Sequence, residues 1–281
     1  MNLSIFKRVF CGFAAIFLFI AGLPVLAAAG AKIKIDDTKF FQIGMGYRGS
    51  LTVEEDAATN GTDSSFNPAT ENFRLYTVSQ AHKNIQVEFN TELATASDTS
   101  GTTADVHRRG VILLDAVAKL DLGVFDLWLG RQLPPSDRTN MDGPFYLNAA
   151  WAYPMIQSFG NLGCTKCNGR DDGIAIHGEV NGGKFKWAYG LFEGLEAGAD
   201  QEDKVRHTGS LTYAFDDAEP GFYAGSTYFG AKKITTLNFA MHHEEDGGGT
   251  ATDQGDFTGY SVDALIERTL GNGAVVDLEG A

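Results

Sequence analysis

The chain has 281 residues, and its 22 Lys and Arg against 36 Asp and Glu give a net charge of −14. This acidic excess, without a basic stripe, excludes nucleic acid as a partner. The 34 glycines and 20 phenylalanines are typical of many β-strands separated by turns, and beyond the amino terminus no apolar run is long enough for a membrane helix.

The amino terminus predicts export. Two basic residues precede the apolar run 9–26, which ends in three alanines. A charged start, an apolar centre and small residues at a cleavage site are the parts of a signal peptide, so residues 1–29 are expected to be removed. The alternative is an uncleaved membrane helix, because the run is close to the ~18 residues that such a helix needs. Gly22 and Pro24 favour cleavage, since they interrupt the run.

After the signal, segment after segment alternates apolar and polar side chains, the pattern of a β-strand with two different faces. In 110–122, for example, Ile112, Leu114 and Ala116 are predicted on one face and Asp115 on the other. The predicted strands are 39–51, 73–81, 84–93, 110–122, 124–131, 173–180, 184–193, 204–215, 222–243, 257–270 and 274–281.

The hairpin 173–193 shows the two faces most clearly. Asn181-Gly182-Gly183 has the turn chemistry that joins two antiparallel strands. In its second strand Trp187 and Tyr189 share one face, and Lys186 lies on the other. In a soluble sandwich the aromatic face would meet a second sheet, whereas in a transmembrane barrel it would meet lipid and the charged face would line water.

The connections between predicted strands alternate in length. Long polar connections follow the odd-numbered strands, and short turns such as 216–221 follow the even-numbered ones. Outer-membrane barrels have short turns at one rim and long loops at the other, while a sandwich has no reason to sort its loops in this way. The sequence therefore predicts an all-β, antiparallel transmembrane β-barrel.

The predicted strands do not complete such a barrel, because their number is odd and bacterial single-chain barrels have an even number. The last run still alternates at its end, with Val276 and Leu278 opposite Asp277 and Glu279. An open barrel would leave unpaired strand edges in hydrocarbon, where every backbone polar group needs a partner. We therefore expect this chain to be an amino-terminal fragment of a longer protein, with residues 30–281 forming part of the barrel.

Two stretches carry a family resemblance. GRQLPPSDRTN (130–140), followed by NGRDDGIAIHGEVNGGKFKWAYGLFEG (168–194), resembles Gram-negative outer-membrane porins, most closely the phosphate-selective porin O/P type. The resemblance implies a trimeric barrel of about 16 strands in the outer membrane. It also implies that the third external loop folds inward to narrow the pore. Here the third long connection, 132–170, is also the longest.

Charged residues of the inward loop and of the polar strand faces are the candidates for lining the pore, since charge at a narrow point governs ion passage. The alternative for each of them is that it only solvates a water-filled wall. The loop candidates are Arg131, Asp137, Arg138, Asp142 and Arg170, and the wall candidates are Arg48, Glu88, Asp115, Lys119, His177, Lys184, Lys186 and Arg206. No dense ladder of arginines is present, so anion or cation selectivity stays open.

Two further motifs each have a structural and a functional interpretation. Cys164 and Cys167 have the spacing of a redox motif but lack the βαβ setting that it requires, and a local disulfide is favoured over metal binding. The stretch 242–246, which reads His-His-Glu-Glu-Asp, contains possible metal ligands, but a hydrated acidic loop is the favoured interpretation.

The sequence predicts a porin that lets small hydrophilic solutes or inorganic ions diffuse passively through the outer membrane. We expect outer-membrane lipid as its surroundings, a homotrimer as its assembly, and no catalytic residue, metal or cofactor. Two alternatives remain: a barrel enzyme of the protease or lipase type, and a barrel that sheathes an electron-transfer partner.

Overall fold

The computed structural model describes residues 31–93, 110–142, 169–195 and 198–281. They form one antiparallel sheet of 12 strands, in which each strand pairs with its neighbours in sequence, and the predicted all-β antiparallel architecture is confirmed. A short helix, α2 (Arg138–Asp142), follows β6. The strands are β1 (Ala31–Lys34), β2 (Phe40–Glu54), β3 (Ser65–His82), β4 (Ile85–Leu93), β5 (Val111–Asp121), β6 (Asp126–Gln132), β7 (Asp171–Val180), β8 (Phe185–Phe192), β9 (Arg206–Ala214), β10 (Ile234–Thr250), β11 (Asp253–Thr269) and β12 (Val275–Gly280).

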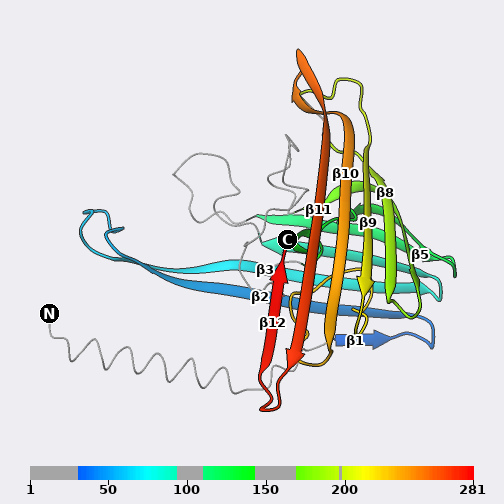
Figure 1. Cartoon of the computed structure of the whole chain (residues 1–281), viewed down its shortest axis with the longest axis horizontal. Helices are drawn as coiled ribbons and strands as arrows, with labels where there is room; N and C mark the ends of the chain where they lie inside the picture. Colours follow the sequence, from blue (N-terminus) through cyan, green and yellow to red (C-terminus); the bar gives the residue numbers. More distant parts are fainter. Residues whose placement is uncertain (1–30, 94–109, 143–168, 196–197) are drawn as a thin grey trace.

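The sheet is strongly twisted and curved. In Figure 1 the long strands β2 and β3 lie across the view, whereas β10 and β11 run up it. Such a change of strand direction is the accumulated right-handed twist of neighbouring strands. The order begins with β1 and ends with β12, so these two strands lie at opposite ends of the sheet. Among the described residues, no helix is both long and apolar enough for a membrane crossing.

The predicted hairpin 173–193 is confirmed as β7 and β8. Val180 pairs with Phe185 next to the turn, and Asn181, Gly182 and Gly183 all have positive φ. Asparagine and glycine adopt this left-handed conformation at the lowest cost, which is why the sequence marks the turn.

A β-bulge in β5 changes the predicted faces. Asn90 pairs with Asp115 and Thr91 with Leu113, so Leu114 has no partner in β4. An extra residue in one strand shifts its alternation by one position. As a result Ile112, which was predicted on the face of Ala116, lies on the opposite one.

The connection between β9 and β10 is longer than predicted. Residues 222–233, expected to begin a strand, belong with 215–221 to one irregular segment, and β10 starts at Ile234. Phe222 and Tyr223 are adjacent aromatics that both pack against the sheet, which a strand with alternating faces does not allow. Positive φ at Phe229 and Gly230 breaks the extended conformation further.

The predicted acidic loop 244–256 is mostly strand. β10 continues to Thr250 and β11 begins at Asp253, so only two residues join them. Glu244 is completely buried, and its carboxylate pairs with Arg206 of the neighbouring strand β9 at 2.6 Å. The alternation of long and short connections therefore fails at this end of the chain.

The two faces of the sheet differ sharply. We call the side with Glu88, Asp115, Lys186 and Asp263 the inner face, and the other side the outer face; strand pairing keeps these residues on one side. The outer face exposes large apolar side chains at alternate positions of strand after strand. They include Ile43, Met45, Tyr47, Val87, Phe89, Leu129, Ile174, Leu211, Tyr213, Leu237, Phe239, Met241, Tyr260 and Val262.

Candidate functional site

Two segments of the chain pack on the inner face. We call residues 133–142 the β6–β7 arm and residues 215–233 the β9–β10 arm. The arms leave the sheet at opposite rims, since one follows an even-numbered strand and the other an odd-numbered one. Every residue of the β6–β7 arm is buried. The candidate functional site consists of the two arms and the inner-face side chains that hold them.

The β6–β7 arm lies against β10 and β11. Asn238 Nδ2 donates to the Ser136 carbonyl at 3.5 Å, and His242 Nε2 lies 2.9 Å from the Pro135 carbonyl. The backbone N–H of Arg138 donates to Asp263 Oδ2 at 3.0 Å. This part of the predicted constriction segment 132–170 therefore follows the inner wall; the remainder, 143–168, lies outside the described residues.

Arg138 joins the two arms. Its guanidinium donates to both carboxylate oxygens of Glu219, at 2.7 and 2.8 Å. The Tyr228 hydroxyl donates to the same carboxylate at 2.7 Å. Burial raises the pKa of Glu219, but the hydrogen bonds and charge of Arg138 outweigh burial and hold that pKa below its ordinary value. Glu219 is therefore a carboxylate paired with a guanidinium.

Asp142 at the end of the β6–β7 arm behaves differently. The Ser226 hydroxyl of the β9–β10 arm donates to its carboxyl at 2.6 Å. Burial raises the pKa of Asp142 to about 8, because the Ser226 hydrogen bond and the charge of Arg138 do not offset the loss of water. This carboxyl is mostly protonated at neutral pH.

A second set of contacts lies around Lys119 of β5. Its ammonium is 2.5 Å from Glu88 Oε1 and 3.6 Å above the Trp128 ring. His177 packs on Trp128 with ring centroids 4.2 Å apart, and Phe222 of the β9–β10 arm lies 4.9 Å from His177. Trp128 and His177 therefore form the part of the inner face against which Phe222 of this arm packs.

Three more of the predicted lining residues, Arg170, Lys184 and Lys186, form contacts on this side of the sheet. Arg170 Nε donates to Asp115 at 3.0 Å, and Asn90 donates to the same carboxylate at 2.9 Å. Lys186 donates to the Glu219 carbonyl at 2.5 Å, and Lys184 donates to the carbonyl of Asp216. These two lysines of the β8 region hold the backbone of the β9–β10 arm.

Most of the predicted lining residues lie on the inner face or in the arms, but Arg131 differs. It pairs in register with Ala116 and Asp172, which places it on the outer face, where it binds Asp172 at 2.8 Å. Inner-face or arm positions hold Arg48, Glu88, Asp115, Lys119, Asp137, Arg138, Asp142, His177, Lys186 and Arg206. Arg170 and Lys184 directly precede β7 and β8, and they bind the inner-face residue Asp115 and the β9–β10 arm, respectively. Cys164, Cys167 and the signal 1–29 lie outside the described residues.

Sequence reasoning missed the β9–β10 arm and its carboxylate Glu219. One signal was available: Phe222-Tyr223 and Lys232-Lys233 are adjacent like pairs, which contradict an alternating strand. The stretch 242–246 belongs to strand β10 rather than to a hydrated loop, and its residues His242 and Glu244 are buried. In the described part of the chain no group of three or more His, Cys, Asp or Glu is arranged to hold a metal.

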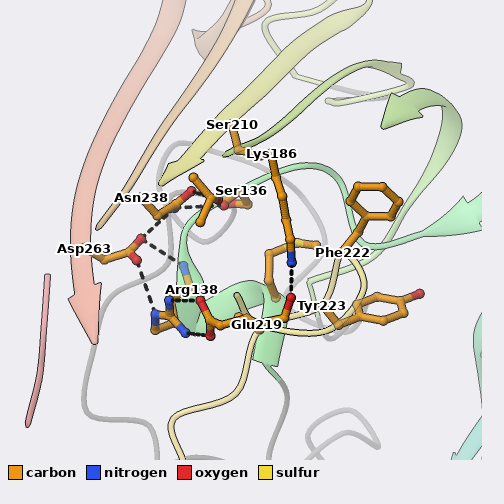
Figure 2. A pocket seen from close by; sticks show the side chains of 12 residues that line it. Ser136, Arg138, Lys186, Ser210, Glu219, Phe222, Tyr223, Asn238 and Asp263 are labelled. Atoms are coloured by element: carbon orange, nitrogen blue, oxygen red, sulfur yellow. Dashed lines mark hydrogen bonds and ion pairs between the residues drawn. The ribbon is translucent and has the colours of Figure 1, made fainter. Parts of the chain in front are cut away.

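A pocket lies between the two arms and the wall (Figure 2). Its volume is about 50 Å³, and Arg138, Glu219 and Asp263 lie along one side of it. Lys186 reaches into it from β8, and Ser136, Ser210, Thr212 and Asn238 add further polar groups to the lining. The chain matches no model of a known protein family, and it matches no curated protein.

Proposed function

We propose that this chain forms the wall and constriction of an outer-membrane porin, through which small hydrophilic solutes or ions diffuse passively. The observation that carries the proposal is the inverted polarity of the sheet. Met45 is 73% exposed and Tyr260 63% exposed on the outer face, while charged residues such as Arg206 and Glu267 are buried on the inner face. A soluble protein in water buries its apolar side chains instead.

A surrounding lipid bilayer would account for the exposed apolar side chains of the outer face. Alternation of outward apolar and inward polar residues is the arrangement that a transmembrane barrel needs, because one face of each strand contacts lipid. Antiparallel pairing on both sides also satisfies the backbone hydrogen bonds of the strands between the edge strands β1 and β12, as hydrocarbon requires. Outer-membrane lipid is therefore the partner that fits the outer face.

The two arms favour a porin over a barrel that sheathes an electron-transfer partner. They are held on the inner face by the Arg138–Asp263 ion pair and by the hydrogen bond from Lys186 to the Glu219 carbonyl, and they occupy space that a carried protein would need. The inward course of the β6–β7 arm also agrees with the third-loop constriction that the porin resemblance implies. Passive transport needs no catalytic residue or cofactor, and we propose none. A homotrimer is part of the proposal by the same resemblance.

Single-channel recording in planar bilayers tests the proposed function. We expect stepwise ion currents from the inserted protein, and efflux of a small dye from loaded liposomes. Reversal potentials in asymmetric salt then measure anion or cation selectivity. Insertion without current would contradict the porin proposal, and hydrolysis of peptide or ester substrates by the same preparation would support the barrel-enzyme alternative.

A further inference from the structure

The two arms enter from opposite rims and meet at one point on the inner face. The side chain of Arg138 and the carboxylate of Glu219 form a bidentate ion pair there (Figure 2). A weaker second link lies close by, where the Ala224 N–H donates to the Met141 carbonyl at 3.3 Å. The Ser226 hydroxyl adds the third link through Asp142.

The ion pair is buried and strongly anchored to the wall on both sides. Arg138 is 2% exposed and Glu219 is 6% exposed. Asp263 of β11 binds the arginine at 3.5 Å, and Lys186 of β8 binds the backbone of the glutamate at 2.5 Å. A bidentate pair between guanidinium and carboxylate fixes both distance and orientation. At the ion pair, each arm is therefore held by the other arm and by a strand of the sheet, β11 for Arg138 and β8 for Glu219.

Little open space remains beside the pair. The pocket between the arms and the wall has a volume of about 50 Å³. A water molecule needs roughly 10–15 Å³ measured in this way, so the pocket holds only a few waters or a small ion. A larger solute does not fit into this gap between the arms and the sheet unless an arm moves.

We propose that Arg138 and Glu219 form a latch that joins the arms and sets the size limit of the pore. This inference rests on the proposed porin function and adds the residues that determine its selectivity by size. With the latch closed, the passage beside it admits small inorganic ions. Removing the charge of Glu219 leaves the buried guanidinium with the more distant carboxylate of Asp263 as its ion-pair partner, which favours hydration and release of the β9–β10 arm.

The first test is Glu219→Gln in the full chain. This change keeps the size of the side chain and removes its charge. We expect a severalfold rise in single-channel conductance, and faster efflux of a sugar-sized probe such as raffinose from liposomes. Unchanged conductance and unchanged raffinose efflux in a folded variant would overturn the latch.

The second test detects movement of the β9–β10 arm by cysteine labelling and does not depend on an ion current. Ser226 is completely buried in the β9–β10 arm, so Ser226→Cys, in a chain whose own cysteines are replaced by serine, provides a label site. We expect this cysteine to resist a membrane-impermeant maleimide and to react when Glu219→Gln is added. Equal protection with and without Glu219→Gln would overturn the latch, even if conductance changed.

The matched control is Glu92→Gln. Glu92 forms a buried ion pair with Arg74 at 2.6 Å, and this pair joins two strands of the sheet, β3 and β4. The introduced cysteine should therefore stay protected in Glu92→Gln. Absence of current in the unmodified protein would contradict the porin proposal alone, because maleimide labelling still tests the latch in the same membranes.

Discussion

Lys119 and Tyr223 are 104 residues apart in sequence, yet the lysine ammonium lies 3.4 Å from the tyrosine hydroxyl and 4.8 Å from its ring centroid. The same ammonium pairs with Glu88 of β4 and lies over Trp128 of β6. One cation of β5 therefore links its two neighbouring strands to the β9–β10 arm. Tyr223 sits in a site so poor in water that burial raises its pKa well above the ordinary value, and it stays a neutral phenol.

Lys119→Met should destabilise the protein, since it leaves the Glu88 carboxylate buried without its cation. We expect a loss of about 3 kcal/mol in the free energy of unfolding, the cost of breaking a buried pair from one side. Urea unfolding in lipid vesicles, followed by tryptophan fluorescence, measures it. The double variant Lys119→Met/Glu88→Gln should lose less than Lys119→Met alone, because no charge is left unpaired. A larger loss in the double variant would contradict this account.

Stability should fall as the pH rises from about 4 towards 8, through Asp142. The folded chain keeps the proton on this carboxyl up to its pKa of about 8, whereas the unfolded chain releases it near its ordinary value. Unfolding then releases a proton between these values, so higher pH favours the unfolded state. The groups that act on Asp142 are Ser226, Glu279, Arg138 and Glu219.

Asp142→Asn should remove that part of the pH dependence. The amide has a similar shape and does not ionise, so the urea midpoint of the variant should change less between pH 6 and pH 9 than that of the unmodified protein. Ser226→Ala serves as a control, because it removes the hydrogen bond but leaves the carboxyl titratable. Identical pH profiles for Asp142→Asn and the unmodified chain would show that Asp142 does not carry the effect.

The strands were predictable because period-two alternation is a local property of the sequence. The hairpin β7–β8 shows this, since Asn181-Gly182-Gly183 marks the turn and the flanking residues alternate on both sides. The bulge at Leu114 was not predictable, because one extra residue in β5 is defined only relative to β4. Simple alternation therefore assigns the residues of β5 on one side of the bulge to the wrong face of the sheet.

The candidate site was predicted as separate residues, not as contacts. Alternation placed Lys119 and Lys186 on the polar face of their strands. Their partners lie in the β9–β10 arm, a segment that was predicted as a turn followed by a strand. The Arg138–Glu219 pair joins positions 81 residues apart. Such long-range pairing depends on the order of strands in the sheet, which local patterns do not contain.

Gly130 should tolerate no side chain. Its φ of +114° is in the region that favours glycine, and a Cβ there would lie 2.3 Å from the backbone oxygen of Ala116. We expect Gly130→Ala to cost about 3 kcal/mol or more in unfolding free energy, from backbone strain and the clash together. Gly271→Ala is the control, since a Cβ at this turn position meets nothing within 4 Å. A similar midpoint of urea unfolding for both variants would contradict the structure around Gly130.

An arginine on the outer face should show whether this face contacts lipid. Phe239 lies inside β10 (Ile234–Thr250), away from both ends of the strand, and is stacked on Tyr260 with ring centroids 6.3 Å apart. If its surroundings are the centre of a bilayer, Phe239→Arg should cost about 2–4 kcal/mol in the free energy of unfolding from vesicles. Val53 is next to the end of β2 and is 65% exposed, so Val53→Arg should cost at most about 1 kcal/mol, the value near or outside the membrane interface. The difference between these two free-energy costs shows whether the outer face contacts lipid or water. In water, an exposed arginine is tolerated equally well at both positions. Equal and small costs would therefore exclude the bilayer as the surroundings of the outer face, and with it the porin.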